Sequence, residues 1–140
     1  MTPVKQTIES NKQLKIKGNC LQACVASLLD LPLEQVPHFV SFSDDEWVNI
    51  FLDFIYAKGY ICEGYAPFSE INNESLKSGV DDFFIVTGQS PRGIKHAVIY
   101  KKDQMFHDPH ISNSGLIKLE GFYLIKKGPG PMSNPWRLFF

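Results

Sequence analysis

The sequence has little of what marks a nucleic-acid-binding or membrane protein. Its 14 lysines and arginines nearly balance its 15 aspartates and glutamates, which leaves a net charge of −1. A balanced charge gives no overall attraction to polyanions such as nucleic acid or an anionic membrane. No run of ~20 apolar residues could span a bilayer, and the opening MTPVKQTIESNKQ has no apolar signal core. We expect a cytoplasmic protein, monomeric or a small homo-oligomer, that binds neither nucleic acid nor membranes.

Cysteine is also scarce, with Cys20, Cys24 and Cys62 as the three examples. An odd number makes no disulfide framework, and a cytosolic chain keeps its thiols reduced. Cys20 and Cys24, four residues apart on a helix, are a poor pair because a disulfide needs a specific Cβ geometry. The chain has no internal repeat, and its 140 residues, 44% hydrophobic, suit one compact domain over 1–140.

Hydrophobic spacing predicts two helices in the first half of the chain. Asn19 is a good N-cap, and apolar residues recur at helical spacing from Cys20 until Pro32 ends the pattern. A second helix is predicted to begin near Ser43, the first residue of an S-x-x-E capping box, and to end at Gly59.

The second half of the chain predicts strands at 81–88, 95–102, 104–108 and 121–128. A short helix near Ser69–Lys77 is also predicted. Because the helices precede the strands, the expected fold class is α+β with an antiparallel sheet rather than a parallel βαβ array.

The strands at 95–102 and 104–108 bring a histidine and a carboxylate together. If 101–103 form a three-residue hairpin loop, His96 opposes Asp108, and opposed residues lie on one face with Cβ atoms ~5 Å apart. A two-residue loop would shift the register by one residue but would leave Asp108 nearby. A histidine oriented by a carboxylate is the base half of a nucleophilic site.

Cys20 is the matching nucleophile in this interpretation. A sulfur in the first turn of a helix lies at the positive end of the macrodipole, which favours the thiolate, and His96 as imidazolium would pair with it. Cys24, one turn further on, and Cys62 are interpreted as buried core residues. Each residue alone is more often structural, but together they favour a triad of Cys20, His96 and Asp108.

A structural zinc site is the main alternative for these residues. It would use the two helix cysteines, Cys20 and Cys24, as ligands. The other two ligands would come from the three histidines His96, His107 and His110. Both sulfurs would lie on one continuous helix, however, and His107 should point to the opposite sheet face from Asp108. We therefore expect no metal and no cofactor. His38 and His110 lie in loop-like stretches; His110 could line a cleft near Asp108, but a solvated loop histidine is the favoured interpretation.

The segment GNCLQACVASLL resembles the nucleophile helix of papain-like cysteine peptidases, especially the bacteriocin-leader-processing (double-glycine) peptidases. In that group a C-G-x-A-C-L-A-type segment opens the central helix with the nucleophilic cysteine. HAVIY, followed by DP twelve residues after its histidine, is similar to the group's His strand and Asp-Pro strand end. The resemblance implies that Cys20 is the nucleophile, His96 the base and Asp108 the orienting acid. The pattern also resembles small uncharacterised proteins of bacteria and phages.

The resemblance covers 6–40 and 95–110 and carries further expectations. It implies a papain-like fold, with an N-terminal nucleophile helix and a second helix packed on a C-terminal antiparallel sheet. PVKQT is similar to the segment that supplies an oxyanion-hole glutamine, which makes Gln6 one candidate; Gln13, seven residues before the nucleophile, is the other. Leu21 departs from the family, since many members have glycine there.

The expected function is a cysteine-dependent hydrolase that cleaves an amide bond, in a peptide or isopeptide, through a thioester. The expected partner is a peptide or protein substrate. The same triad could serve a protein glutamine deamidase or an acyl transferase. A different class of function is a non-catalytic binding or inhibitor module that uses the aromatic tail after Lys126.

Overall fold

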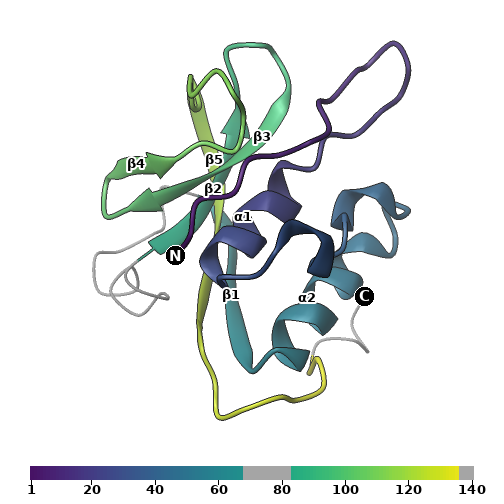
Figure 1. Ribbon diagram of the computed structural model, residues 1–140, viewed down its shortest axis with the longest axis vertical. Helices are drawn as coiled ribbons and strands as arrows, with labels where there is room; N and C mark the ends of the chain where they lie inside the picture. The colour runs from purple at the N-terminus through teal and green to yellow at the C-terminus, as the bar shows by residue number, and fades with distance from the viewer. Residues whose placement is uncertain (68–82, 136–140) are drawn as a thin grey trace.

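The computed structural model describes residues 1–67 and 83–135 (Figure 1). Its helical elements are α1 (Cys20–Leu28), η1 (Leu33–Gln35), η2 (Phe39–Ser41) and α2 (Trp47–Ala57). Its strands are β1 (Tyr60–Pro67), β2 (Phe83–Gln89), β3 (Lys95–Lys101), β4 (Gln104–His107) and β5 (Lys118–Lys127). The α+β class predicted from the sequence is confirmed. The helix predicted at Ser69–Lys77 and residues 136–140 of the aromatic tail lie outside the described residues.

The five strands form one sheet in the order β1-β5-β2-β3-β4, with every neighbouring pair antiparallel. The last strand in the chain, β5, therefore lies between β1 and β2. Helix α1 packs against β3 and α2 against β1. The nucleophile candidate at the start of α1 is in this way brought to the strand that carries His96.

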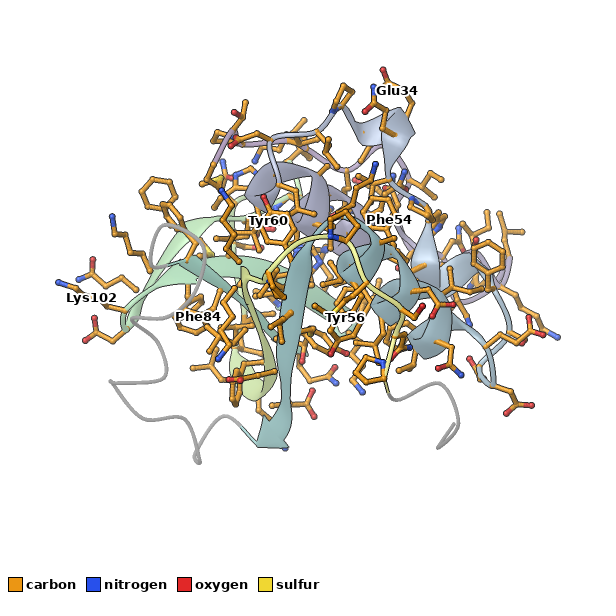
Figure 2. All side chains as sticks on the ribbon, turned by 90° about the horizontal axis from the view of Figure 1, so that it is seen from below. Glu34, Phe54, Tyr56, Tyr60, Phe84 and Lys102 are labelled. Atoms are coloured by element: carbon orange, nitrogen blue, oxygen red, sulfur yellow. The ribbon has the colours of Figure 1, made fainter. Side chains whose placement is uncertain are left out.

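Side chains alternate between the two faces of the sheet, as expected for strands. On one face, residues such as Ile85 and Ile99 pack with both helices in the main core. On the other face, Phe84, Val86 and Val98 belong to a second, smaller apolar cluster. Figure 2 shows Phe84 on the side of the sheet away from α1. Burial on both faces makes the sheet a firm support for the residues at its edge.

Helix α2 begins later than its sequence predicts. It starts at Trp47, and the Ser43–Glu46 capping box does not form, because the carbonyl of Ser43 rather than its hydroxyl accepts the N–H groups of Glu46 and Trp47. The predicted stop is correct, since Gly59 follows the helix with φ of +89°, a conformation that favours glycine.

Asn19 precedes α1 as expected, but its side chain does not cap the helix. Its Oδ1 instead accepts hydrogen bonds from the backbone N–H groups of Thr7 (2.9 Å) and Ile8 (2.8 Å), and its Nδ2 donates to Thr7 Oγ1 and Gln22 Oε1. The buried side-chain amide of Asn19 thus holds the N-terminal segment against the start of α1 through these hydrogen bonds.

We expect Asn19→Ala to lower the free energy of unfolding by about 2–3 kcal/mol, because it leaves two backbone N–H groups without an acceptor. Urea denaturation followed by circular dichroism measures the change. Asn19→Asp is the matched control, since it keeps the acceptor oxygen and should lose less. Equal stability of the alanine variant and the native chain would show that this anchor contributes nothing.

Within residues 1–67 and 83–135, no helix combines the length and the apolar character needed to cross a bilayer.

Candidate active site

The β3–β4 hairpin differs from its predicted register. Lys101 pairs with Gln104, so the loop has two residues, with Lys102 at φ of +57°, and the predicted three-residue loop is wrong. A bulge then shifts the register again, so that Ile99 pairs with His107. Asp108 lies just beyond the end of β4 rather than opposite His96 in the ladder.

The expected contact between His96 and Asp108 forms despite this register. His96 Nε2 lies 2.6 Å from Asp108 Oδ1, and both side chains are buried. Burial would lower the pKa of His96, but hydrogen bonds and charge interactions with Asp108 and Cys20 outweigh it and raise that pKa to about 9. Burial would raise the pKa of Asp108, but its bonds to His96 and to two backbone N–H groups lower it to about 2. The two side chains therefore form a buried ion pair at neutral pH.

The loop after β4 holds the Asp108 carboxylate in place. Oδ1 also accepts the backbone N–H of His110, and Oδ2 accepts that of Gly115, both at 2.8 Å. Gly115 has φ of +67°, so glycine is the residue suited to this position. The carboxylate thus has bonds from three donors, which satisfies a buried charge.

Lys5 ties the same loop to the N-terminal segment. Its Nζ donates to the carbonyls of Asp108 (2.8 Å) and His110 (3.1 Å) and to Asn113 Oδ1 (2.6 Å). The segment also bonds to both sides of the site: Thr2 N–H donates to a carbonyl of α1, and Gln6 N–H donates to the carbonyl of Pro109. Figure 1 shows this segment passing between α1 and the loop after β4.

Cys20 is the first residue of α1 and is partly exposed. Its thiol lies close enough to His96 to help raise the pKa of that histidine. Since Nε2 of His96 bonds to Asp108, Nδ1 is the ring nitrogen left for Cys20. The structure therefore brings the three predicted triad residues together.

The other two cysteines are core residues, as predicted. Cys24 and Cys62 are buried in the main core, and all three thiols are free. Burial raises the pKa of Cys24, helped by the nearby charges of Cys20 and Asp108. Burial likewise raises the pKa of Cys62 to about 12. Neither thiol is suited to act as a nucleophile at neutral pH.

The two oxyanion-hole candidates lie in different surroundings. Gln13 is exposed in the turn between Asn11 and Ile16. Gln6 is partly buried; its Nε2 donates to the carbonyl of Ile8 at 2.8 Å, while its buried Oε1 has no hydrogen-bond partner in the described part of the chain. Gln6 also bonds through its backbone to Pro109, next to Asp108. Of the two, Gln6 is the residue fixed beside the triad loop.

The remaining histidines are not gathered around a metal. His107 Nε2 lies 2.7 Å from the carbonyl of Val4, and His38 Nε2 lies 3.0 Å from that of Lys17. His110 is buried rather than solvated, which corrects the prediction. Its ring packs edge-on against His96 with centroids 6.1 Å apart, and its Nε2 pairs with Glu9 at 3.1 Å. Across the described ranges, no group of three or more His, Cys, Asp or Glu side chains could hold a metal ion.

A cleft of about 620 Å³ opens beside Cys20 and His96. Its walls include Leu21, Val40, Trp47 and Ile94, and its rim carries lysines. Leu21, the residue after Cys20, is thus part of the cleft wall. Neither Gln6 nor Gln13 is among the residues that line this cleft.

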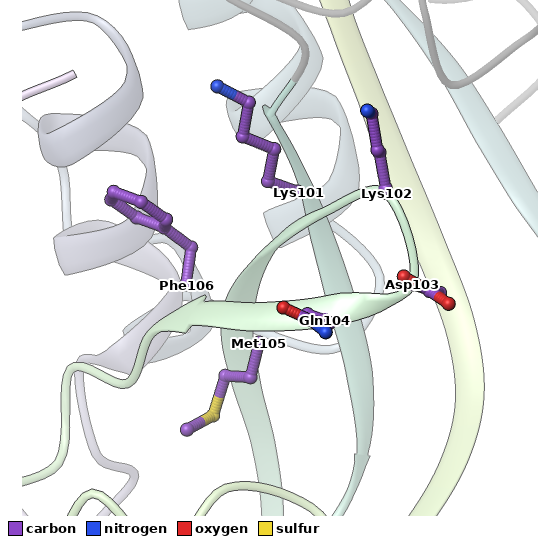
Figure 3. Close-up of a pocket in the computed structure, with 6 residues that line it drawn as sticks. All are labelled: Lys101, Lys102, Asp103, Gln104, Met105 and Phe106. Carbon is purple, nitrogen blue, oxygen red and sulfur yellow. The ribbon is translucent and has the colours of Figure 1, made fainter.

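A second hollow, of about 330 Å³, lies at the tip of the β3–β4 hairpin and contains no triad residue. Figure 3 shows Lys101 and Phe106 pointing to one side of this hairpin and Met105 to the other. Neither a cysteine nor a histidine lines this hollow.

Sequence reasoning missed the residues that support the triad from a distance. The sequence predicts only a helix cap for Asn19, and it gives no signal for the contacts of Lys5 and Gly115 with Asp108. The positive φ of Gly115 could have been inferred from a glycine in a turn-rich stretch, but the contacts of Lys5 span more than 100 residues. No local pattern encodes such a contact.

Comparison of the chain with protein-family models, with curated proteins and with solved structures finds no match.

Proposed function

We propose that the protein is a cysteine-dependent hydrolase that cleaves an amide bond with Cys20, His96 and Asp108. The observation that supports this most is the buried 2.6 Å contact of His96 Nε2 with Asp108 Oδ1, with Cys20 next to the same imidazole in a cleft that both residues line. A nucleophile, a base and a group that orients the base are the parts that acyl transfer needs. The free thiol suits the reducing cytoplasm expected from the sequence.

In the proposed reaction, Cys20 Sγ attacks the carbonyl carbon of the substrate amide as a thiolate. His96 donates its Nδ1 proton to the leaving amine, and the C–N bond breaks to leave a thioester on Cys20. His96 then takes a proton from water, whose oxygen attacks the thioester and releases the acid and the thiolate. Asp108 keeps the imidazole oriented throughout and stabilises its charged form.

The negative charge on the substrate oxygen needs donors in the transition state. Cys20 is the first residue of α1, so its backbone N–H has no partner within the helix and is available for this role. We propose the Gln6 side chain as the second donor because Gln6 is fixed next to the triad loop, whereas Gln13 is exposed in a turn.

We also propose a papain-like arrangement for the fold. A nucleophile at the start of a helix, packed on an antiparallel sheet whose strand carries the histidine, supports this. The same triad supports glutamine deamidation or acyl transfer, which differ from hydrolysis in the leaving group or the acceptor.

Incubation of the purified protein with a peptide library of mixed sequence, followed by mass spectrometry, tests the proposal. We expect new peptide termini that appear with the native chain and not with Cys20→Ser. A gain of one mass unit at glutamine would instead identify deamidation, and peptide ligation would identify transfer. Identical libraries after treatment with the native chain and Cys20→Ser would contradict a catalytic role for this site.

We expect Gln6→Ala to lower kcat/KM by about 10²–10³-fold, the usual effect of losing one oxyanion donor. Gln13→Ala is the matched control and should change kcat/KM less than twofold, because its side chain is exposed in a turn, whereas Gln6 is bonded to Pro109 next to Asp108. Steady-state cleavage of a peptide found in the library measures both. The reverse ranking would move the oxyanion donor to Gln13.

A further inference from the structure

We infer that the cleft beside Cys20 selects acidic polypeptide segments through lysines carried by the loop before α1 and by the start of β3. The inference rests on the proposed function for its link to catalysis, but the binding it describes can be measured separately.

The charge at the cleft is strongly one-sided. Four lysines are among its lining residues: Lys12, Lys15, Lys17 and Lys95. The one acidic residue that lines it is Asp44, whose Oδ1 lies 3.0 Å from Lys17 Nζ, so this pair is neutral overall. The chain as a whole carries a net charge of −1, so the local excess of positive charge does not reflect the composition.

Two other acidic groups, Glu9 and Asp108, are engaged elsewhere and do not neutralise these lysines. Glu9 pairs with His110, and Asp108 is buried against His96. Within the described ranges, Lys15 and Lys95 have no ion-pair partner, and Lys12 donates one bond to the carbonyl of Gly93 at 2.9 Å. Three ammonium groups are therefore available to an anionic ligand.

These lysines line the same cleft as Cys20 and His96. Lys95 directly precedes His96 on β3, and Lys17 is three residues before Cys20. A carboxylate held by Lys15 or Lys95 would therefore occupy the same cleft as a substrate amide at Cys20.

The loop that carries Lys12 and Lys15 is held in a defined conformation. Asn11 and Ile16 exchange two backbone hydrogen bonds of 2.9 Å, and Asn11 Oδ1 accepts the N–H of Leu14. At its base, the N–H of Gly18 donates to Ser10 Oγ at 2.8 Å. A loop that is already ordered loses little entropy when it binds a ligand.

The apolar part of the cleft favours a polypeptide over a nucleic acid as the anionic ligand. Val40 and Ile94 line the cleft, and Leu14 and Ile16 are exposed on the adjoining loop. These four residues provide apolar surface on which hydrophobic side chains of a bound peptide can pack. Single-stranded nucleic acid binds by stacking its bases on free aromatic faces. The two aromatic residues of the cleft, Trp47 and Tyr123, instead have ring contacts with Phe51.

Fluorescence anisotropy with the full chain carrying Cys20→Ala tests the inference without catalysis. The probes are three fluorescein-labelled 12-residue peptides with the same apolar residues, alternating with Glu, Gln or Lys. At about 20 mM salt we expect the Glu peptide to bind about tenfold more tightly than the Gln peptide and the Lys peptide most weakly. At about 0.5 M salt the preference for Glu should fall to about twofold.

A pair of charge-matched variants locates the effect. In the Cys20→Ala background, Lys15→Gln with Lys95→Gln should weaken binding of the Glu peptide about fivefold and leave the Gln peptide unchanged. Lys118→Gln with Lys127→Gln removes the same charge from exposed positions of β5. This control should leave the affinities for the Glu peptide and the Gln peptide unchanged. Equal effects of the two double variants, or equal affinity for the Glu and Gln peptides, would overturn the inference.

Three further results bear on this inference, and the last two separate it from the proposed function. Tighter binding of a labelled single-stranded 20-nucleotide DNA than of the Glu peptide would overturn the polypeptide assignment. Selective binding of the Glu peptide by a protein that shows no Cys20-dependent products would support the inference and contradict the proposed reaction. Cys20-dependent cleavage with no preference for acidic peptides would do the reverse.

Discussion

Replacing His96 with alanine should slow the alkylation of Cys20 by iodoacetamide at pH 6 by about 10–100-fold. An ordinary thiol is well under 1% ionised at this pH, whereas a thiolate paired with an imidazolium reacts readily. Because the pKa of His96 is raised to about 9, the native imidazole is charged at pH 6 and can hold such a thiolate. Site-resolved mass spectrometry of the labelled cysteines measures the rate.

The comparison needs controls that separate the ionisation of the Cys20 thiol from the access of iodoacetamide to it. His107→Gln is a matched variant, since His107 bonds to the carbonyl of Val4 and lies outside the triad. Its Cys20 should react as fast as that of the native chain. Above pH 9, the rates of the native chain and His96→Ala should converge, because free thiols are then largely ionised. A folded His96→Ala protein that reacts at the native rate at pH 6 would contradict the thiolate–imidazolium pair.

Asp108→Ala should destabilise the protein by about 3–5 kcal/mol near pH 6, because it leaves a buried imidazole without its anionic partner. It also removes the acceptor for the N–H groups of His110 and Gly115. Thermal unfolding should show a fall in Tm of about 10 °C. Asp44→Ala is the control: its carboxylate pairs with Lys17 at an exposed position, and its loss should shift Tm by less than about 2 °C.

The effect of Asp108→Ala should depend on pH in a defined direction. The folded pKa of His96, about 9, lies above the ordinary value near 6.5, so this stabilisation is complete below about pH 6.5 and is lost as pH rises through 9. The folded pKa of Asp108, about 2, lies below the ordinary value near 3.9, so its stabilisation is present above about pH 3.9 and is lost as pH falls toward 2. The native chain should therefore exceed the variant in free energy of unfolding by the largest amount between about pH 4 and 6.5. A stability difference that grows above pH 9 would contradict the ion pair.

The three candidate residues could be chosen from the sequence because of their combined positions in the predicted helix and strands, although each alone is a weak signal. Cys20 follows a turn and opens an apolar helical pattern, and His96 and Asp108 lie at the far ends of two consecutive strand patterns. The class of the fold followed from the order of helices and strands. These features depend on short stretches of chain, which periodicity describes well.

The register of the hairpin and the support of the triad could not be read in this way. The two-residue loop and the bulge of β4 shift the pairing in the same direction, and Asp108 reaches His96 from beyond the strand end. Its position is set by Lys5 and Gly115, and Lys5 comes from the other end of the chain. Such contacts depend on packing, which a single sequence does not display.

The closed loop between Asn11 and Ile16 also has a consequence for which changes of sequence and length the protein can accept. Its two ends are joined by backbone hydrogen bonds, so residues can be added or removed between them without moving Gln6 or Cys20. Counting residues back from the nucleophile is therefore a poor guide to the oxyanion donor. Because of the same closure, we expect substitutions within 12–15 to alter ligand preference without moving the triad residues.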